Sequence, residues 1–205
     1  KKGDEKVNVF ADRVLEIEGL EWLTVEEAYK LTDASAERSA AGCTFRHDPA
    51  KAKPYVENNL RFPQNNSGKR HAAKVVQTLI AQMEEWLANP TLLEPDEGAS
   101  YAEVVEIDLS TLAPHIAGPH PPDLARPVGQ LSADAKQNDY PLELSSCLIG
   151  SCTNSSYEDF SRAADIANQA AKHGAKVKTQ LWCTPGSEQV DDTVARDGQK
   201  AALEA

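Results

Sequence analysis

The most informative segment of the chain is Leu148-Ile149-Gly150-Ser151-Cys152-Thr153-Asn154-Ser155-Ser156-Tyr157-Glu158-Asp159. It begins at the end of an apolar run, 142–149, which predicts a buried strand. After it, apolar side chains recur at i, i+3 and i+4 spacing, which is typical of one face of a helix. Ser155 with Glu158 three residues later is a capping-box pattern that predicts a helix start directly after the cysteine. We therefore expect a strand, a polar turn and a helix, in that order.

Cys152 falls on this predicted strand-to-helix turn. Backbone N–H groups and the dipole at a helix start favour negative charge, so we expect the thiol to ionise readily. A thiolate binds metal ions or attacks electrophiles, and Ser151, Thr153 and Asn154 are short polar side chains that suit a small polar ligand or cluster sulfides. A lone cysteine is more often a small buried apolar residue. The polar run around Cys152 argues against that, but the residues alone leave metal ligand and nucleophile open.

Together with Thr184-Pro185-Gly186-Ser187-Glu188-Gln189 further along the chain, this stretch resembles the aconitase family. The resemblance implies that Cys152 is one of three thiolates that hold a [4Fe–4S] cluster, with Ser151, Thr153 and Asn154 also in the cofactor site. It implies an aconitate hydratase, a lyase that isomerises citrate to isocitrate through cis-aconitate. In that chemistry a cluster iron acts as a Lewis acid on the tricarboxylate substrate.

A second segment, 31–43, is rich in small residues that allow close approach of other backbone or a ligand. Asp33 and Glu37 are four residues apart and share one face of a helix. From the pattern alone, a solvated helix start with Asp33 as N-cap fits equally well. Together with 10–20 the segment resembles bacterial aconitase B, and Ala36-Glu37 matches an Ala-Glu helix of mitochondrial-type aconitases. The resemblance implies that Glu37 is a catalytic carboxylate beside the cluster and Asp33 its neighbour, although mitochondrial-type enzymes have asparagine there.

Periodicity and turn residues predict the remaining elements of the first half. In chain order these are strands within 7–20, a helix over 21–31, a surface loop over 44–70, a helix over 69–88 and a strand over 104–109. Thr24 followed by Glu27 is a capping-box pattern for the first of these helices. The longer helix carries an apolar stripe and ends at Asn89-Pro90.

The segment 113–127 holds five of the twelve prolines and predicts a stiff, extended linker. Beyond it the patterns give a strand over 142–149, a helix over 157–173, a strand over 176–183 and a further helix toward Ala205. Ligands bind outside the carboxyl ends of the strands in such α/β sheets. The two polar turns, 151–156 and 184–188, are therefore expected on one edge.

We thus expect an α/β fold made of two small units of the aconitase type. Residues 1–112 resemble the second domain of an aconitase. Residues 128–205 resemble the start of its third domain and carry the cluster cysteine, and 113–127 joins the two units.

Composition limits the classes of function. The net charge of −11 argues against a general nucleic-acid surface and means that a polycarboxylate substrate needs local cations. No apolar run approaches the ~20 residues of a membrane span. The four cysteines form no C-x-x-C motif, which favours reduced thiols in a cytoplasmic compartment; they are Cys43, Cys147, Cys152 and Cys183.

The family takes its other cluster cysteines from a C-x-x-C motif that this chain lacks. We therefore expect an internal fragment of a larger aconitase, whose partners are the remaining aconitase domains. Alone, it is expected to hold no stable cluster and to be inactive. The alternatives are a non-catalytic or RNA-binding regulatory module, a related hydro-lyase such as 2-methylisocitrate dehydratase, and a cysteine-nucleophile enzyme. The last would need a histidine near Cys152, and His173 lies at the far end of the following helix.

Overall fold

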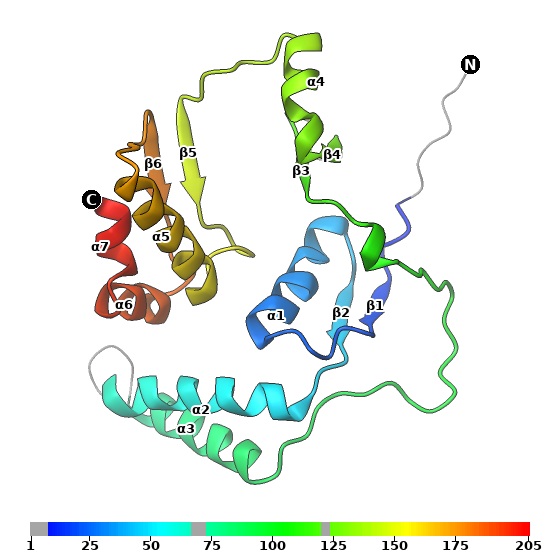
Figure 1. Ribbon diagram of the computed structural model, residues 1–205. Coiled ribbons are helices and arrows are strands. Elements are labelled where there is room, and N and C mark those ends of the chain that lie inside the picture. Colours follow the sequence, from blue (N-terminus) through cyan, green and yellow to red (C-terminus); the bar gives the residue numbers. More distant parts are fainter. Residues whose placement is uncertain (1–7, 67–72, 120–123) are drawn as a thin grey trace. The chain divides into compact units, whose positions relative to one another are not determined.

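The computed structural model describes residues 8–66, 73–119 and 124–205 (Figure 1). The strands are β1 (Val14–Ile17), β2 (Gly42–Phe45), β3 (His115–Ala117), β4 (Ala125–Pro127), β5 (Ser146–Ile149) and β6 (Gln180–Cys183). The α-helices are α1 (Val25–Ala34), α2 (Pro49–Asn66), α3 (Ala73–Ala88), α4 (Leu131–Gln137), α5 (Tyr157–Lys172), α6 (Glu188–Arg196) and α7 (Gln199–Glu204). Three short 3₁₀ turns complete the list: η1 (Ala36–Arg38), η2 (Leu109–Thr111) and η3 (Val128–Gln130).

The described strands form small sheets of two strands each. β1 and β2 are parallel, with Val14 opposite Gly42 and Ile17 opposite Phe45. Because α1 connects them, this part of the chain is a β-α-β unit. β3 and β4 are antiparallel, and β5 pairs with β6. Helices combined with parallel and antiparallel strands confirm the predicted α/β class.

The chain divides into two compact units by its internal contacts. The first unit contains the residues up to Glu97 together with Leu148–Lys176 and Cys183–Ala205. The second contains Gly98–Cys147 and Val177–Trp182. The boundaries of these two compact units differ from those of the two predicted domains, 1–112 and 128–205. The predicted domain division remains a prediction. The 150–156 turn, the second polar turn, α1, α5 and α6 all belong to the first unit.

One of the two predicted capping boxes exists, and the other forms one residue later than predicted, from different residues. Thr24 caps α1: its side chain accepts a hydrogen bond from the Glu27 N–H, and Glu27 accepts one from the Thr24 N–H. The cap of α5 is Ser156 with Asp159, so the prediction of Ser155 with Glu158 is wrong. Ser155 is instead buried in the preceding turn, where its carbonyl oxygen accepts a hydrogen bond from Gly186.

The predicted surface loop over 44–70 is also wrong, because helix α2 takes up most of its described part; positions 67–70 lie outside the described residues. Asp48 caps this helix by accepting a hydrogen bond from the Ala50 N–H at 2.8 Å. Pro49 takes the first helical position, where a missing N–H costs nothing. Ala52 is buried, and α2 packs along α3 (Figure 1). The sequence prediction treated the prolines as breakers and so missed the helix.

Four smaller predictions differ from the structure. The predicted buried strand over 142–149 is wrong in length and burial, because β5 covers only Ser146–Ile149 and both Leu144 and Leu148 are exposed. The strand pattern over 7–20 gives a strand only at β1 within its described part, 8–20, after a turn in which Asp12 has φ 59°; position 7 lies outside the described residues. Residues 104–109 form no strand, since their apolar side chains are exposed and no described strand pairs with them. The described part of 113–127 is not a simple extended linker, because it contains the paired strands β3 and β4. The predicted helix over 69–88 is α3, and its positions 69–72 lie outside the described residues.

Candidate functional site

The two polar turns after β5 and β6 lie against each other, as the sequence predicted. The Thr184 N–H donates to the Ile149 carbonyl oxygen at 2.9 Å, and the Gly186 N–H donates to the Ser155 carbonyl oxygen at 3.1 Å. Gly150 has φ +115°, and a Cβ atom there would overlap the Thr184 carbonyl group. Glycine is therefore needed at position 150 for both its backbone angle and the close approach.

Ser151 shapes the turn that carries the cysteine. Its hydroxyl oxygen accepts hydrogen bonds from the N–H groups of Thr153 (3.2 Å) and Asn154 (3.0 Å). These two donors are thus engaged within the turn, and α5 begins only at Tyr157. The predicted helix over 157–173 is therefore confirmed as α5, and four residues of turn separate Cys152 from its first helical residue. Asn154 is exposed beside it.

The structure brings Cys152 and Glu37 together. The Cys152 thiol donates to Oε1 of Glu37 at 3.6 Å, and the Cys152 sulfur lies 3.7 Å from the Thr153 hydroxyl oxygen. Glu37 stands on η1, directly after α1, and Cys152 is exposed. A carboxylate and a thiol that are 115 residues apart in sequence therefore face one another at one site.

Asp33 completes the acidic side of this site. Its Oδ2 accepts a hydrogen bond of 2.6 Å from the Thr153 hydroxyl, so the last turn of α1 is tied to the cysteine turn. Asp33 is inside α1 and is not the N-cap that the alternative interpretation required. On its other side it accepts a bond from the Tyr29 hydroxyl at 3.4 Å. Partial burial and the adjacent Asp33 carboxylate raise the pKa of Tyr29 above its ordinary value.

The start of α5 is held against α1 by charged groups. Lys30 Nζ lies 2.7 Å from Oδ1 of Asp159, and the Glu158 N–H donates to Oε2 of Glu26 at 3.0 Å. Burial alone would raise the pKa of Asp159, but hydrogen bonds from Lys30 and Ser156 outweigh it and lower that pKa. Sequence patterns did not single out Lys30. Its only signal was its place on α1, one turn before Asp33.

The other cysteines have different surroundings. Cys43 is half-buried on β2, and burial raises its pKa. Cys183 is exposed as a residue, yet atoms around its sulfur desolvate it enough to raise its pKa as well. Cys147 is half-buried on β5.

Cys152 fits the role of a single cluster ligand, because its thiol is exposed and has small polar neighbours. Within the ranges 8–66, 73–119 and 124–205, no three His, Cys, Asp or Glu residues are grouped to hold a metal ion. The described residues therefore offer one thiol and not a complete ligand set. Over the same ranges, no helix is long and apolar enough to cross a membrane.

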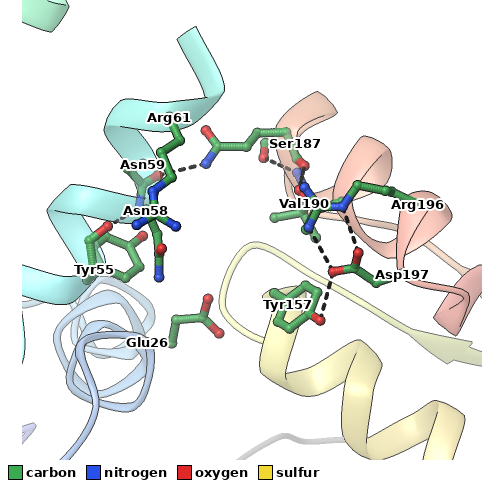
Figure 2. Close-up of a pocket in the computed structure, with 12 residues that line it drawn as sticks. Glu26, Tyr55, Asn58, Asn59, Arg61, Tyr157, Ser187, Val190, Arg196 and Asp197 are labelled. Atoms are coloured by element: carbon green, nitrogen blue, oxygen red, sulfur yellow. Dashed lines mark hydrogen bonds and ion pairs between the residues drawn. The ribbon is translucent and has the colours of Figure 1, made fainter. Parts of the chain in front are cut away.

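A cavity of about 880 Å³ lies in the same unit, between α2 and the helices α5 and α6 (Figure 2). Gln189 on α6 donates to Oδ1 of Asn59 on α2 at 2.8 Å, which bridges the cavity. The Tyr157 hydroxyl donates to Asp197 at 3.0 Å, and Arg196 makes two bonds to the same carboxylate. The sequence prediction missed this cavity because it missed α2, which forms one wall.

Comparison with known proteins agrees with the motif. A family model described as the aconitase family (aconitate hydratase) matches residues 6–205. A mitochondrial aconitate hydratase of Candida albicans is 49% identical over 143 residues, which is 70% of this chain and 18% of the relative. One from Saccharomyces cerevisiae is 50% identical over 138 residues (67% and 18%), and one from Arthroderma benhamiae is 55% identical over 112 residues (55% and 14%). The matched part of this chain thus spans less than a fifth of each relative. Since the family model covers almost every residue, the chain belongs to the aconitase family.

Proposed function

We propose that this chain forms one wall of the active site of an aconitate hydratase, which isomerises citrate to isocitrate through cis-aconitate. The observation that carries the proposal is the meeting of Cys152 with Glu37 and, through Thr153, with Asp33. These groups come from two segments far apart in sequence, and a purely structural role would not require a thiol and two carboxylates at one exposed turn.

In this proposal Cys152 is a thiolate ligand of a [4Fe–4S] cluster, and further ligands come from the remaining aconitase domains. When bound, such a cluster supplies an iron that acts as a Lewis acid toward the substrate. Ser151 and Asn154 line the same cofactor site. Ser151 fixes the turn by accepting hydrogen bonds from the N–H groups of Thr153 and Asn154, and Asn154 is exposed.

Glu37 is the proposed proton-handling carboxylate. In this structure its Oε1 accepts a hydrogen bond from the Cys152 thiol. A metal-bound thiolate has no proton to donate, so Oε1 then accepts from another donor, for which the substrate hydroxyl is the natural candidate. A carboxylate that accepts this hydrogen bond is placed to orient the hydroxyl or to take its proton.

Asp33 has an orienting role in this proposal. Its 2.6 Å bond from Thr153 fixes that hydroxyl, and Thr153 in turn lies beside the Cys152 sulfur. Because the site contributes negative groups and the chain carries a net charge of −11, the cations that bind the substrate carboxylates come from the other domains. The base that removes the carbon-bound proton also lies outside this chain.

The free thiols support a reducing cellular compartment for this protein. All four cysteines are free, which fits a reducing compartment. The sequence alone predicted the cytoplasm, whereas the relatives reported above are named as mitochondrial enzymes. Both compartments keep thiols reduced, so the cytoplasmic assignment stays a prediction.

The test uses the complete hydratase, meaning this chain with the remaining aconitase domains, after anaerobic reconstitution with iron and sulfide. We expect citrate and isocitrate to be dehydrated, with cis-aconitate followed by its ultraviolet absorbance. Faster turnover of 2-methylisocitrate would assign the related dehydratase function instead. No turnover of any of these substrates by reconstituted protein would contradict the proposal.

A further inference from the structure

The position of the acidic groups depends on how α1 is fixed to the start of α5. Asp33 lies in the last turn of α1, and Glu37 follows on η1. Cys152 lies on the turn that leads into α5. Any shift of α1 along α5 would therefore change the distance between the Glu37 carboxylate and the Cys152 sulfur.

Two ion pairs connect the helices, and they differ in burial. Arg162 on α5 lies 3.2 Å from Glu27, but its side chain is 60% exposed. Exposed pairs of this kind contribute little, because water screens them and long side chains lose conformational entropy. The Lys30–Asp159 pair is shorter, at 2.7 Å, and its side chains are only 15% and 17% exposed. Breaking a buried pair is costly because it leaves an uncompensated charge.

Asp159 has a second set of partners. Its Oδ2 accepts hydrogen bonds from the N–H (3.1 Å) and the hydroxyl (2.9 Å) of Ser156, which caps α5. Lys30 uses the other oxygen, Oδ1. The carboxylate thus joins the cap of α5 to α1. Removal of Lys30 leaves the cap bonds in place, whereas removal of Asp159 would disrupt both.

We propose that Lys30 is a positioning residue which, through Asp159, holds Asp33 and Glu37 against the Cys152 turn. Lys30 is less than one helical turn from Asp33, so its anchoring point is close to the groups that it places. The importance of Lys30 for turnover rests on the function proposed above. Its effect on the distance between Glu37 and Cys152 does not. The proposal can therefore be tested without any catalytic measurement.

The test measures proximity in the full chain. Cys43, Cys147 and Cys183 are replaced by serine, Glu37→Cys is introduced, and a short bis(methanethiosulfonate) joins position 37 to Cys152 through one disulfide at each end. The effective molarity for closing the second disulfide, measured against glutathione, reports how well the two positions are held together, because the short linker spans only a narrow range of distances. We expect Lys30→Met to lower the effective molarity about tenfold, and Lys30→Arg to restore it to within about threefold. Lys172→Met, an exposed lysine at the far end of α5, should leave it unchanged.

Circular dichroism of each variant shows whether the helices remain. If Lys30→Met loses helical signal, Lys30→Gln is compared instead, since it keeps a polar donor without the charge and should still lower the effective molarity at least about threefold. The proposal would be overturned if a folded Lys30→Met or Lys30→Gln variant had the same effective molarity as the protein that keeps Lys30. That result would leave the proposed hydratase function standing. A lack of hydratase activity would, conversely, leave the disulfide result standing.

Discussion

The sulfur of Cys152 lies 3.6 Å from Oε1 of Glu37, although 115 residues separate the two in the chain. One residue follows the helix of a β-α-β unit, and the other stands on a turn between a strand and a helix. Both belong to the first compact unit. The predicted proximity of Glu37 and Cys152 is thereby confirmed, and their chemical roles can be tested one residue at a time.

Glu37→Gln in the complete hydratase should lower turnover by roughly 10²-fold or more, if the carboxylate takes part in proton transfer. The cluster should be retained, because Glu37 is not one of its ligands in this account. Steady-state kinetics with isocitrate and the visible absorbance of the cluster measure the two effects separately.

The matched control for this variant is Glu84→Gln, on the exposed surface of α3. It should change turnover by less than about twofold. Glu27 would be a poor control, because it belongs to the capping box of α1 and pairs with Arg162. If Glu37→Gln and Glu84→Gln both changed turnover only slightly and to the same extent, Glu37 would have no role in catalysis.

Gly150→Ala should destabilise the first unit by more than about 2 kcal/mol. The residue has φ +115°, and the added methyl group would meet the Thr184 carbonyl group, which is backbone and is tied to β5 by the hydrogen bond from the Thr184 N–H to the Ile149 carbonyl oxygen. Urea unfolding measures the change. Gly42→Ala is the control, since it lies in the same unit and its added carbon meets only the Val14 side chain at 3.9 Å, an ordinary contact; a loss there as large as at Gly150 would contradict the explanation.

How much the sequence could predict depended on whether a signal was local. The turn around Cys152, the cap at Thr24 and the α/β class all depend on short patterns, and the structure confirms them. The cap of α5 was misplaced by one residue because Ser155 and Ser156 both have suitable partners three residues later. Only the packing of Ser155 against Gly186 decides between them.

Longer-range features gave no such signal. In the sequence, Lys30 is indistinguishable from any other helical lysine. Only the packing of α5 against α1 places Asp159 beside it. The cavity wall on α2 has no local signal, because turn residues in 44–70 favour a loop, whereas Pro49 in fact starts the helix. The proximity of Glu37 to Cys152 was predicted only through the family resemblance, since no periodicity in the chain relates the two.

The contribution of the Lys30–Asp159 ion pair to the free energy of unfolding should depend on pH. Because the pKa of Asp159 is lowered in the folded chain, its contribution is present above the ordinary carboxyl pKa of about 4 and is lost as the pH falls below it. The difference in unfolding free energy between the unmodified chain and Asp159→Asn should therefore shrink from pH 6 toward pH 3. The same comparison in a Lys30→Met background should show a weaker dependence, and an unchanged one would contradict the assignment.

Limited alkylation at neutral pH should label Cys152 before Cys43 and Cys183. Cys152 is exposed, whereas burial of the sulfur raises the pKa of the other two thiols and lowers their thiolate fraction. Peptide mapping after short exposure to iodoacetamide identifies the labelled residue. Earlier labelling of Cys43 or Cys183 would show that the turn protects Cys152 more than its exposure indicates.

Cluster assembly in Cys152→Ser shows whether Cys152 is a ligand of the cluster. The complete hydratase and its Cys152→Ser and Cys147→Ser variants are reconstituted anaerobically with iron and sulfide, and visible absorbance and bound iron are measured. The account predicts that Cys147→Ser assembles the same cluster as the unmodified enzyme and that Cys152→Ser loses most of the absorbance and iron. An undiminished [4Fe–4S] signal in folded Cys152→Ser would contradict it.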